Sequence, residues 1–227
     1  MSNKLLLFDI DGTLIDTGQA GTRALDRAFL HLFGIRDAFK GIRMAGKTDI
    51  QIIRECLRIH GIPDSIDEIN GMVRMYIDLL TEEIENPWRS VMAGVVDLLE
   101  TLKADGRPMG LLTGNIEEGA RIKLNALGLN RYFPAGAFGS DHEDRDMLLP
   151  IAVERFSALG INIPPEQCIV IGDTPRDVRC ARVHGASCIA VSTGSYNREA
   201  LMEAGADLVL ESLENREACL GFMSAGL

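Results

Sequence analysis

The 227-residue chain has no apolar run of about 18 residues, no cluster of lysine and arginine, and no cysteine or histidine spacing typical of a metal site. The first absence argues against a membrane-spanning helix. The second, together with a net charge of −10, argues against nonspecific nucleic-acid binding, because the phosphate backbone requires basic side chains. A small phosphorylated ligand stays compatible with this charge, since it needs only a few local cations or a metal.

The five cysteines are odd in number and scattered along the chain, with no CxxC pair. The amino terminus lacks the charged and apolar pattern of a signal peptide. These two features predict a cytoplasmic protein whose thiols are reduced and fill the core. The four histidines have no spacing that favours a metal site or a catalytic triad, so we expect packing or surface roles for them.

From about residue 91 onward, helical and strand patterns alternate along the chain. Apolar strand-like runs recur at 108–112, 135–140, 168–172, 187–193 and 207–210, each separated from the next by a helical pattern. Such alternation is typical of parallel strands joined by right-handed crossovers. The sequence therefore predicts an α/β fold with a Rossmann-like parallel sheet and helices on both faces. We expect the buried strand 4–8 to belong to the same sheet.

A segment of different character separates strand 4–8 from this array. Residues 21–34, 48–61 and 65–85 each show helical apolar spacing, and no strand-like run lies between them. Turn and breaker residues bound the segment at 16–18 and 86–87. We therefore expect an all-helical unit, residues 16–88, inserted into a catalytic core of residues 1–15 and 89–227.

Polar clusters follow three of the predicted strands. The runs are DIDGT at 9–13, TGN at 113–115 and GDTPRD at 172–177. Ligands of open α/β sheets bind outside the carboxyl ends of the strands, so these clusters should meet at one edge. Converging carboxylates repel one another and require a cation or a proton.

The residue types at this edge suit phosphoryl chemistry. Carboxylate oxygens without histidine or thiolate favour Mg²⁺, which often takes phosphate oxygens as further ligands. A carboxylate can attack phosphorus to form an aspartyl-phosphate. The glycines Gly12 and Gly114, with Thr113, would supply backbone and hydroxyl donors for phosphate oxygens.

These motifs resemble motifs I, II and IV of the haloacid dehalogenase superfamily, in the runs DIDGTLID, TGN and GDTPRD. The helical insertion after the first motif resembles the C1 cap of that superfamily, and the overall pattern is similar to phosphoglycolate-phosphatase-like members. The resemblance spans nearly the whole chain. It implies a Mg²⁺-dependent phosphatase that hydrolyses a small phosphorylated metabolite, active as a monomer or homodimer.

The resemblance also implies roles for individual residues. Asp9 would be the nucleophile, and Asp11 would protonate the leaving alcohol and then activate water. Asp9, the backbone carbonyl of Asp11, and Asp173 would hold the metal, with Asp177 ordering that site. Thr113 would bind a phosphoryl oxygen, next to Gly114 and Asn115.

The third motif departs from the superfamily pattern. A lysine is expected just before the helix that leads into the GD strand, yet this region reads EDRDMLLP. Arg145 is the nearest cation, and Lys123 lies well inside the preceding helix. We expect Arg145 to take the lysine's place and Lys123 to matter little.

Simpler interpretations exist for several of these residues. DG could be a hairpin turn, TGN an ordinary turn, GDTPRD a helix N-cap, and the acidic loop 140–146 a solvated loop. Arg43, Lys47 and Thr48 could select the substrate or simply begin a cap helix near Asp49. For function, the main alternative is a phosphosugar mutase of the same fold; a dehalogenase is disfavoured because Asp11 is present.

Overall fold

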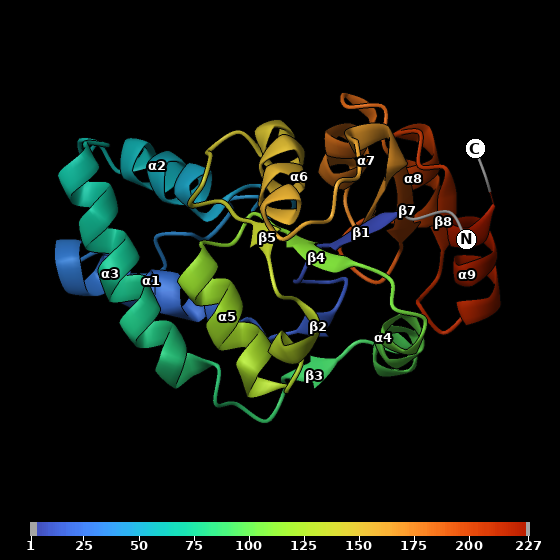
Figure 1. Cartoon of the computed structure of the whole chain (residues 1–227). Helices are drawn as coiled ribbons and strands as arrows, with labels where there is room; N and C mark the ends of the chain where they lie inside the picture. Colours follow the sequence, from blue (N-terminus) through green and yellow to red (C-terminus); the bar gives the residue numbers. More distant parts are fainter. Residues whose placement is uncertain (1–3, 226–227) are drawn as a thin grey trace.

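A six-stranded parallel sheet forms the centre of the protein in a computed structural model that describes residues 4–225 (Figure 1). The strand order is β5-β4-β1-β6-β7-β8, so the first strand of the chain is central. This confirms the predicted α/β class. The strands are β1 Leu5–Phe8, β4 Met109–Leu112, β5 Gly136–Ala137, β6 Cys168–Gly172, β7 Ser187–Val191 and β8 Leu208–Leu210.

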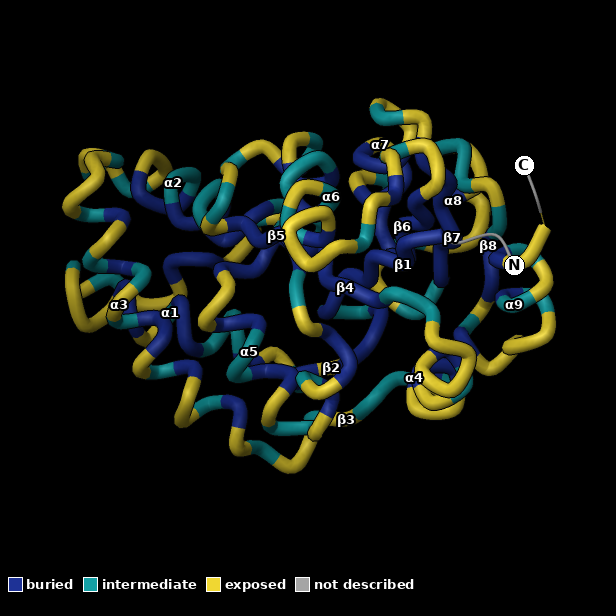
Figure 2. Tube along the Cα trace, in the orientation of Figure 1, coloured by how far each residue is buried: buried dark blue, intermediate teal, exposed yellow. Residues whose placement is uncertain are grey.

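Helices cover both faces of this sheet, as predicted. Leu6 and Phe8 of β1 pack with the helices of one face, and Leu5 and Leu7 pack with those of the other. All four side chains are fully buried, which explains why the strand reads as an unbroken apolar run (Figure 2). The first face carries α4 Val95–Ala104, α5 Glu117–Ala126 and α9 Arg216–Ser224; the second carries α6 Leu148–Ala158, α7 Pro175–Arg182 and α8 Arg198–Glu203.

The inserted segment is helical, also as predicted. It contains α1 Ala20–Phe33, α2 Asp49–Ile59 and α3 Ile66–Glu83, which lie beside the sheet at the left of Figure 1. Their apolar faces share a separate hydrophobic core that includes Phe29, Leu57 and Tyr76. None of the helices between residues 4 and 225 is long and apolar enough to cross a membrane.

A short antiparallel pair joins the insertion to the sheet domain, and the sequence did not indicate it. Strand β2, Ile15–Asp16, pairs with β3, Ser90–Val91. The two chain crossings therefore lie side by side, and the predicted boundary after residue 15 falls within β2. The division into 1–15 with 89–227 and 16–88 stays a prediction.

The amino terminus of α2 contacts the loop after β4 directly. The N–H of Asp49 donates to the carbonyl of Gly114 at 2.8 Å, and the N–H of Ile116 donates to Asp49 Oδ2 at 3.0 Å. A Cβ on Gly114 would lie 2.1 Å from the carbonyl oxygen of Lys47. The insertion can approach this loop so closely only because residue 114 is glycine.

Candidate active site

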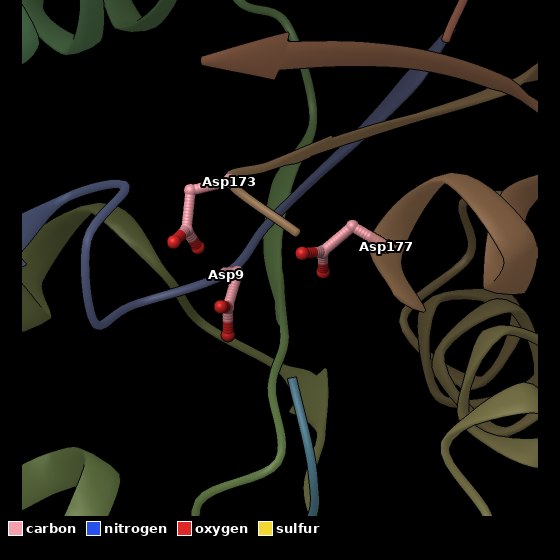
Figure 3. A group of neighbouring side chains, drawn as sticks. All are labelled: Asp9, Asp173 and Asp177. Carbon is pink, nitrogen blue, oxygen red and sulfur yellow. The ribbon is translucent and has the colours of Figure 1, made fainter. Parts of the chain in front are cut away.

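Three buried carboxylates converge where β1 and β6 end. Asp9 follows β1, Asp173 follows β6, and Asp177 lies in the first turn of α7 (Figure 3). One oxygen from each lies within 4.8 Å of the others, and the three residues are at most 5 % exposed. Figure 3 shows the Asp173 and Asp177 side chains directed toward the Asp9 region. The expected meeting of the first and last motifs at one sheet edge is therefore observed.

The charges of this cluster are not balanced by the protein alone. Burial raises the pKa of Asp9 to about 6, against the lowering effect of the Arg145 guanidinium. Burial, together with the carboxylates of Asp177 and Asp9, raises the pKa of Asp173 to about 8. Two acids with this affinity for protons form a site that a cation would stabilise. An all-oxygen donor set of this kind fits a hard divalent metal.

Glycines hold the Asp173 carboxylate in a narrow space. Gly12 has a φ of 81°, and a Cβ there would lie 2.7 Å from Asp173 Oδ2; a Cβ on Gly194 would lie 1.7 Å from the same oxygen. Gly12 is therefore required both by its left-handed backbone and by the carboxylate beside it. Its position immediately after Asp11 has a packing cause that the sequence pattern did not reveal.

Arg145 lies against the nucleophile candidate. It begins the short 3₁₀ helix η2, Arg145–Met147, and is 3 % exposed. Its Nη2 lies 3.2 Å from Asp9 Oδ1 and also contacts Asp177 Oδ1 closely. Asp177 Oδ2 accepts from the N–H and hydroxyl of Thr174, so this carboxylate is already fully engaged. The structure thus brings the predicted cation and Asp9 together through the acidic loop 140–146.

The Nε–H of Arg145 has no hydrogen-bond partner, alone among the buried side-chain polar atoms of residues 4–225. An unpaired buried donor on a charged group is costly. Arg145 also lines the cavity described below.

Lys123, which was expected to matter little, contacts a candidate catalytic residue, while its weight in the reaction stays a prediction. Its Nζ is 2.9 and 2.7 Å from the two carboxylate oxygens of Asp11, and 2.6 Å from Asn115 Oδ1. On α5 the buried positions are Gly119, Ala120, Lys123 and Leu124. Ala120, Lys123 and Leu124 follow an i, i+3, i+4 pattern that is readable from the sequence, but such a pattern does not indicate which distant residue the lysine contacts.

Residues 113–115 link the two halves of the site. Asn115 Nδ2 donates to Asp11 Oδ2 and to Thr113 Oγ1, both at 2.8 Å. Thr113 is fully buried at the end of β4, beside the Asp9 cluster. The carbonyl of Gly114 accepts the hydrogen bond from Asp49, and the absence of a side chain at residue 114 leaves room for Lys47 of the insertion.

The three residues of the insertion that were considered for substrate selection, Arg43, Lys47 and Thr48, lie in different environments. Thr48 caps α2 in a capping box with Gln51 and donates its hydroxyl to the carbonyl of Glu143. Lys47 pairs with Glu55 and lines the cavity, whereas Arg43 does not line it. The cap-helix interpretation is therefore correct for Thr48.

A cavity of about 340 Å³ lies between the sheet edge and the insertion. Asp9, Asp11 and Thr113 line it from the sheet domain, and Asp49 and Tyr76 line it from the insertion. Burial raises the pKa of Asp49 to about 6, although Lys123 lowers it. Motif-based reasoning missed Asp49 and Tyr76, because neither follows a strand of the sheet. Further lining residues of the insertion are Gln19, Thr22, Leu25, Met44 and Ile52.

A doubly covered parallel sheet, a helical insertion after the first strand, and carboxylates at the strand ends together define a known class of hydrolase. Residues 6–191 match the haloacid dehalogenase-like hydrolase family, and the chain belongs to that family.

Curated relatives of this chain are phosphatases. It is 28 % identical over 218 residues to phosphoglycolate phosphatase 1 of Pseudomonas aeruginosa. The aligned region covers 95 % of this chain and 79 % of that protein. It is 25 % identical over 235 residues to the phosphoglycolate phosphatase of Escherichia coli, covering 94 % and 91 %.

Solved structures share the fold. CbbY from Rhodobacter sphaeroides, in complex with phosphate, superposes with a TM-score of 0.77 at 22 % identity, covering 93 % of this chain and 95 % of that one. A predicted phosphoglycolate phosphatase from Haemophilus somnus gives 0.72 at 18 %, covering 97 % and 99 %.

Proposed function

We propose that the protein is a Mg²⁺-dependent phosphatase that hydrolyses a small phosphorylated metabolite through an aspartyl-phosphate on Asp9. The observation that supports this proposal best is the position of the Asp9 carboxylate. It lies at the end of the central strand, 3.2 Å from the Arg145 guanidinium and within 4.8 Å of an Asp173 oxygen. A nucleophilic carboxylate requires both a neighbouring cation and an open cavity, and Asp9 has both.

The metal would be held by the carboxylates of Asp9 and Asp173 and by the backbone carbonyl of Asp11. Asp177 would order this site without joining it, because Arg145 and Thr174 occupy its oxygens. When bound, Mg²⁺ would offset the negative charge of the carboxylates and of a phosphate dianion. The raised pKa values of Asp9 and Asp173 support a cation at this place.

The two aspartates of the first motif divide the chemistry. An oxygen of Asp9 attacks phosphorus while the bond from phosphorus to the ester oxygen breaks, and protonated Asp11 gives its proton to that oxygen. Asp11, now a carboxylate, then takes a proton from a water whose oxygen attacks the aspartyl-phosphate. Phosphate leaves, Asp9 is regenerated as a carboxylate, and Asp11 is protonated again.

Arg145 and Thr113 would hold the transferred group. The unpaired Nε–H of Arg145 offers a donor that a phosphoryl oxygen would satisfy. The 340 Å³ cavity limits the substrate to a small molecule. Two curated relatives carry the name phosphoglycolate phosphatase, so 2-phosphoglycolate heads the candidate substrates.

The test is a screen of small phosphorylated metabolites, including 2-phosphoglycolate, with and without Mg²⁺. It should score both free phosphate and isomerised product, since the second would identify a phosphosugar mutase. We expect Mg²⁺-dependent phosphate release from the wild-type protein and none from Asp9→Asn, because an amide does not attack phosphorus.

The matched control is Asp97→Asn, an exposed aspartate on α4, which should keep wild-type activity. Substantial Mg²⁺-dependent hydrolysis by folded Asp9→Asn protein would refute the nucleophile. Isomerised product without phosphate release would replace the phosphatase by the mutase.

A further inference from the structure

We infer that Lys123 is a positioning residue, which fixes the Asp11 carboxylate so that Oδ1 is the oxygen that carries the moving proton. The inference rests on the proposed function, because it concerns how the acid and base of that reaction is held. It depends on an ammonium inside α5, which lies outside the motifs quoted above, and on the side-chain amide of Asn115, two residues before that helix.

The hydrogen bonds to Asp11 are unequal at its two oxygens. Oδ2 accepts from Lys123 at 2.7 Å and from Asn115 at 2.8 Å, whereas Oδ1 accepts only from Lys123, at 2.9 Å. Each oxygen of a carboxylate offers about two lone-pair positions. Oδ2 is therefore filled, and Oδ1 retains one position for a proton that passes to the leaving group and later returns from water.

Lys123 is itself held firmly. Its side chain is 5 % exposed, and Asn115 Oδ1 takes a third contact of the ammonium at 2.6 Å. A Cβ added to Gly21 of α1 would lie 3.5 Å from Nζ, so the insertion covers this end of the lysine. Because the ammonium contacts three oxygens and is covered by α1, it stays in place while the proton moves at Asp11.

Asp11 needs these two contacts because little else in the protein packs against its side chain. Its side chain is 42 % exposed, whereas Asp9 is buried. An exposed carboxylate can sample several rotamers, whereas proton transfer to the leaving group requires a fixed orientation. Lys123 and Asn115 anchor it from one side and leave the cavity side open.

Lys123 does not replace the lysine of the missing third motif. Its contacts are with Asp11 and Asn115, whereas the carboxylate of Asp9 is contacted by Arg145. The two cations therefore serve different aspartates. A variant of Lys123 should change proton transfer without abolishing attack by Asp9.

The experiment compares two substrates in the wild-type protein and in Lys123→Met. One is the best alkyl phosphate of the screen above, whose leaving group needs a proton; the other is p-nitrophenyl phosphate, whose leaving group does not. We expect kcat for the alkyl phosphate to fall by about 100-fold or more in Lys123→Met, and kcat for p-nitrophenyl phosphate by less than about tenfold. Lys123→Arg should recover part of the alkyl phosphate activity.

The double variant Asp11→Asn/Lys123→Met gives an independent measurement. If Lys123 acts through Asp11, the double variant should be no slower on the alkyl phosphate than Asp11→Asn, within about threefold. Lys103→Met, at an exposed position on α4, is the matched control and should keep both activities. Should Lys123→Met fail to fold, Lys123→Gln can be used to compare the losses of kcat on the two substrates, since glutamine keeps a polar group but carries no charge.

An equal loss on both substrates, no loss, or additive losses in the double variant would overturn the positioning role. In all three outcomes the wild-type protein is an active phosphatase. A wild-type protein that releases no phosphate from either substrate with Mg²⁺ would instead overturn the proposed function, so the two failures are distinguishable.

Discussion

Replacing Asp173 with asparagine should stabilise the metal-free protein at high pH while removing its response to Mg²⁺. Asp173 is 4 % exposed, and the hydroxyl of Thr13, at 3.4 Å, is the only hydrogen-bond donor to its carboxylate among residues 4–225. Asparagine has almost the same shape, so it fits between Gly12 and Gly194 and can still accept that hydrogen bond. The substitution therefore removes a charge without opening a cavity.

The size of the effect follows from the raised pKa of Asp173. In the folded protein burial and the neighbouring carboxylates raise this pKa to about 8, whereas an unfolded chain has an aspartate pKa of about 3.9. The folded protein thus binds the proton more tightly, and its stability falls as pH rises from about 4 to about 8. At about 1.4 kcal/mol per pH unit, Asp173 alone costs on the order of 4 kcal/mol by pH 7.

The assay is urea unfolding in the presence of a chelator at pH 5 and pH 8, repeated with Mg²⁺. Wild type should be less stable at pH 8 than at pH 5 without metal, and Asp173→Asn should show a smaller loss over that range. Mg²⁺ should stabilise wild type at pH 8, by about 2.7 kcal/mol at 100 times its dissociation constant, and the variant much less.

Two results would refute this reasoning. One is an Asp173→Asn protein that is less stable than wild type at pH 8 without metal, which would mean that the charged carboxylate is well compensated by the protein. The other is equal Mg²⁺ stabilisation of both proteins, which would place the metal elsewhere.

Further predictions concern the groups around Asp9 and the contact with the insertion. Arg145→Ala should lower kcat/KM by about 100-fold or more, equivalent to about 3 kcal/mol of transition-state stabilisation, and Arg145→Lys should recover part of it; steady-state kinetics near wild type would contradict this. Asp11→Asn should still gain thermal stability from Mg²⁺, because the proposed ligand there is a backbone carbonyl, while losing alkyl phosphate turnover; loss of the Mg²⁺ shift would make its side chain a ligand. Gly114→Ala should raise KM and lower the melting temperature, because a methyl group would lie 2.1 Å from the Lys47 carbonyl; an unchanged enzyme would show that the insertion need not approach this loop.

The sequence was most informative where backbone pattern and chemistry coincide. Asp9, Thr113 and Asp173 each follow an apolar strand, so parallel pairing alone brings them to one edge. The fold class and the inserted helices were predictable for the same reason, since both depend on apolar periodicity. Arg145 could be proposed because its loop follows a strand of the same sheet.

The remainder depended on tertiary contacts that no local pattern encodes. Lys123 contacts Asp11, which lies 112 residues away in the sequence. A lysine inside a helix is ordinarily expected to place its ammonium at the surface, so the sequence alone does not predict this contact. Asp49 joins the site only because α2 contacts the loop at Gly114. Strands β2 and β3 have two residues each, too few for any periodicity to appear.

The central position of β1 has a consequence for how the protein is made. This strand leaves the ribosome before both of its hydrogen-bonding neighbours, β4 at 109–112 and β6 at 168–172. Contacts so distant in sequence close large loops and are slow to form. The carboxylate cluster around Asp9 can therefore assemble only after Asp173 and Asp177 have emerged. Until then the inserted helices, whose apolar partners lie mostly within 20–84, can pack on their own core.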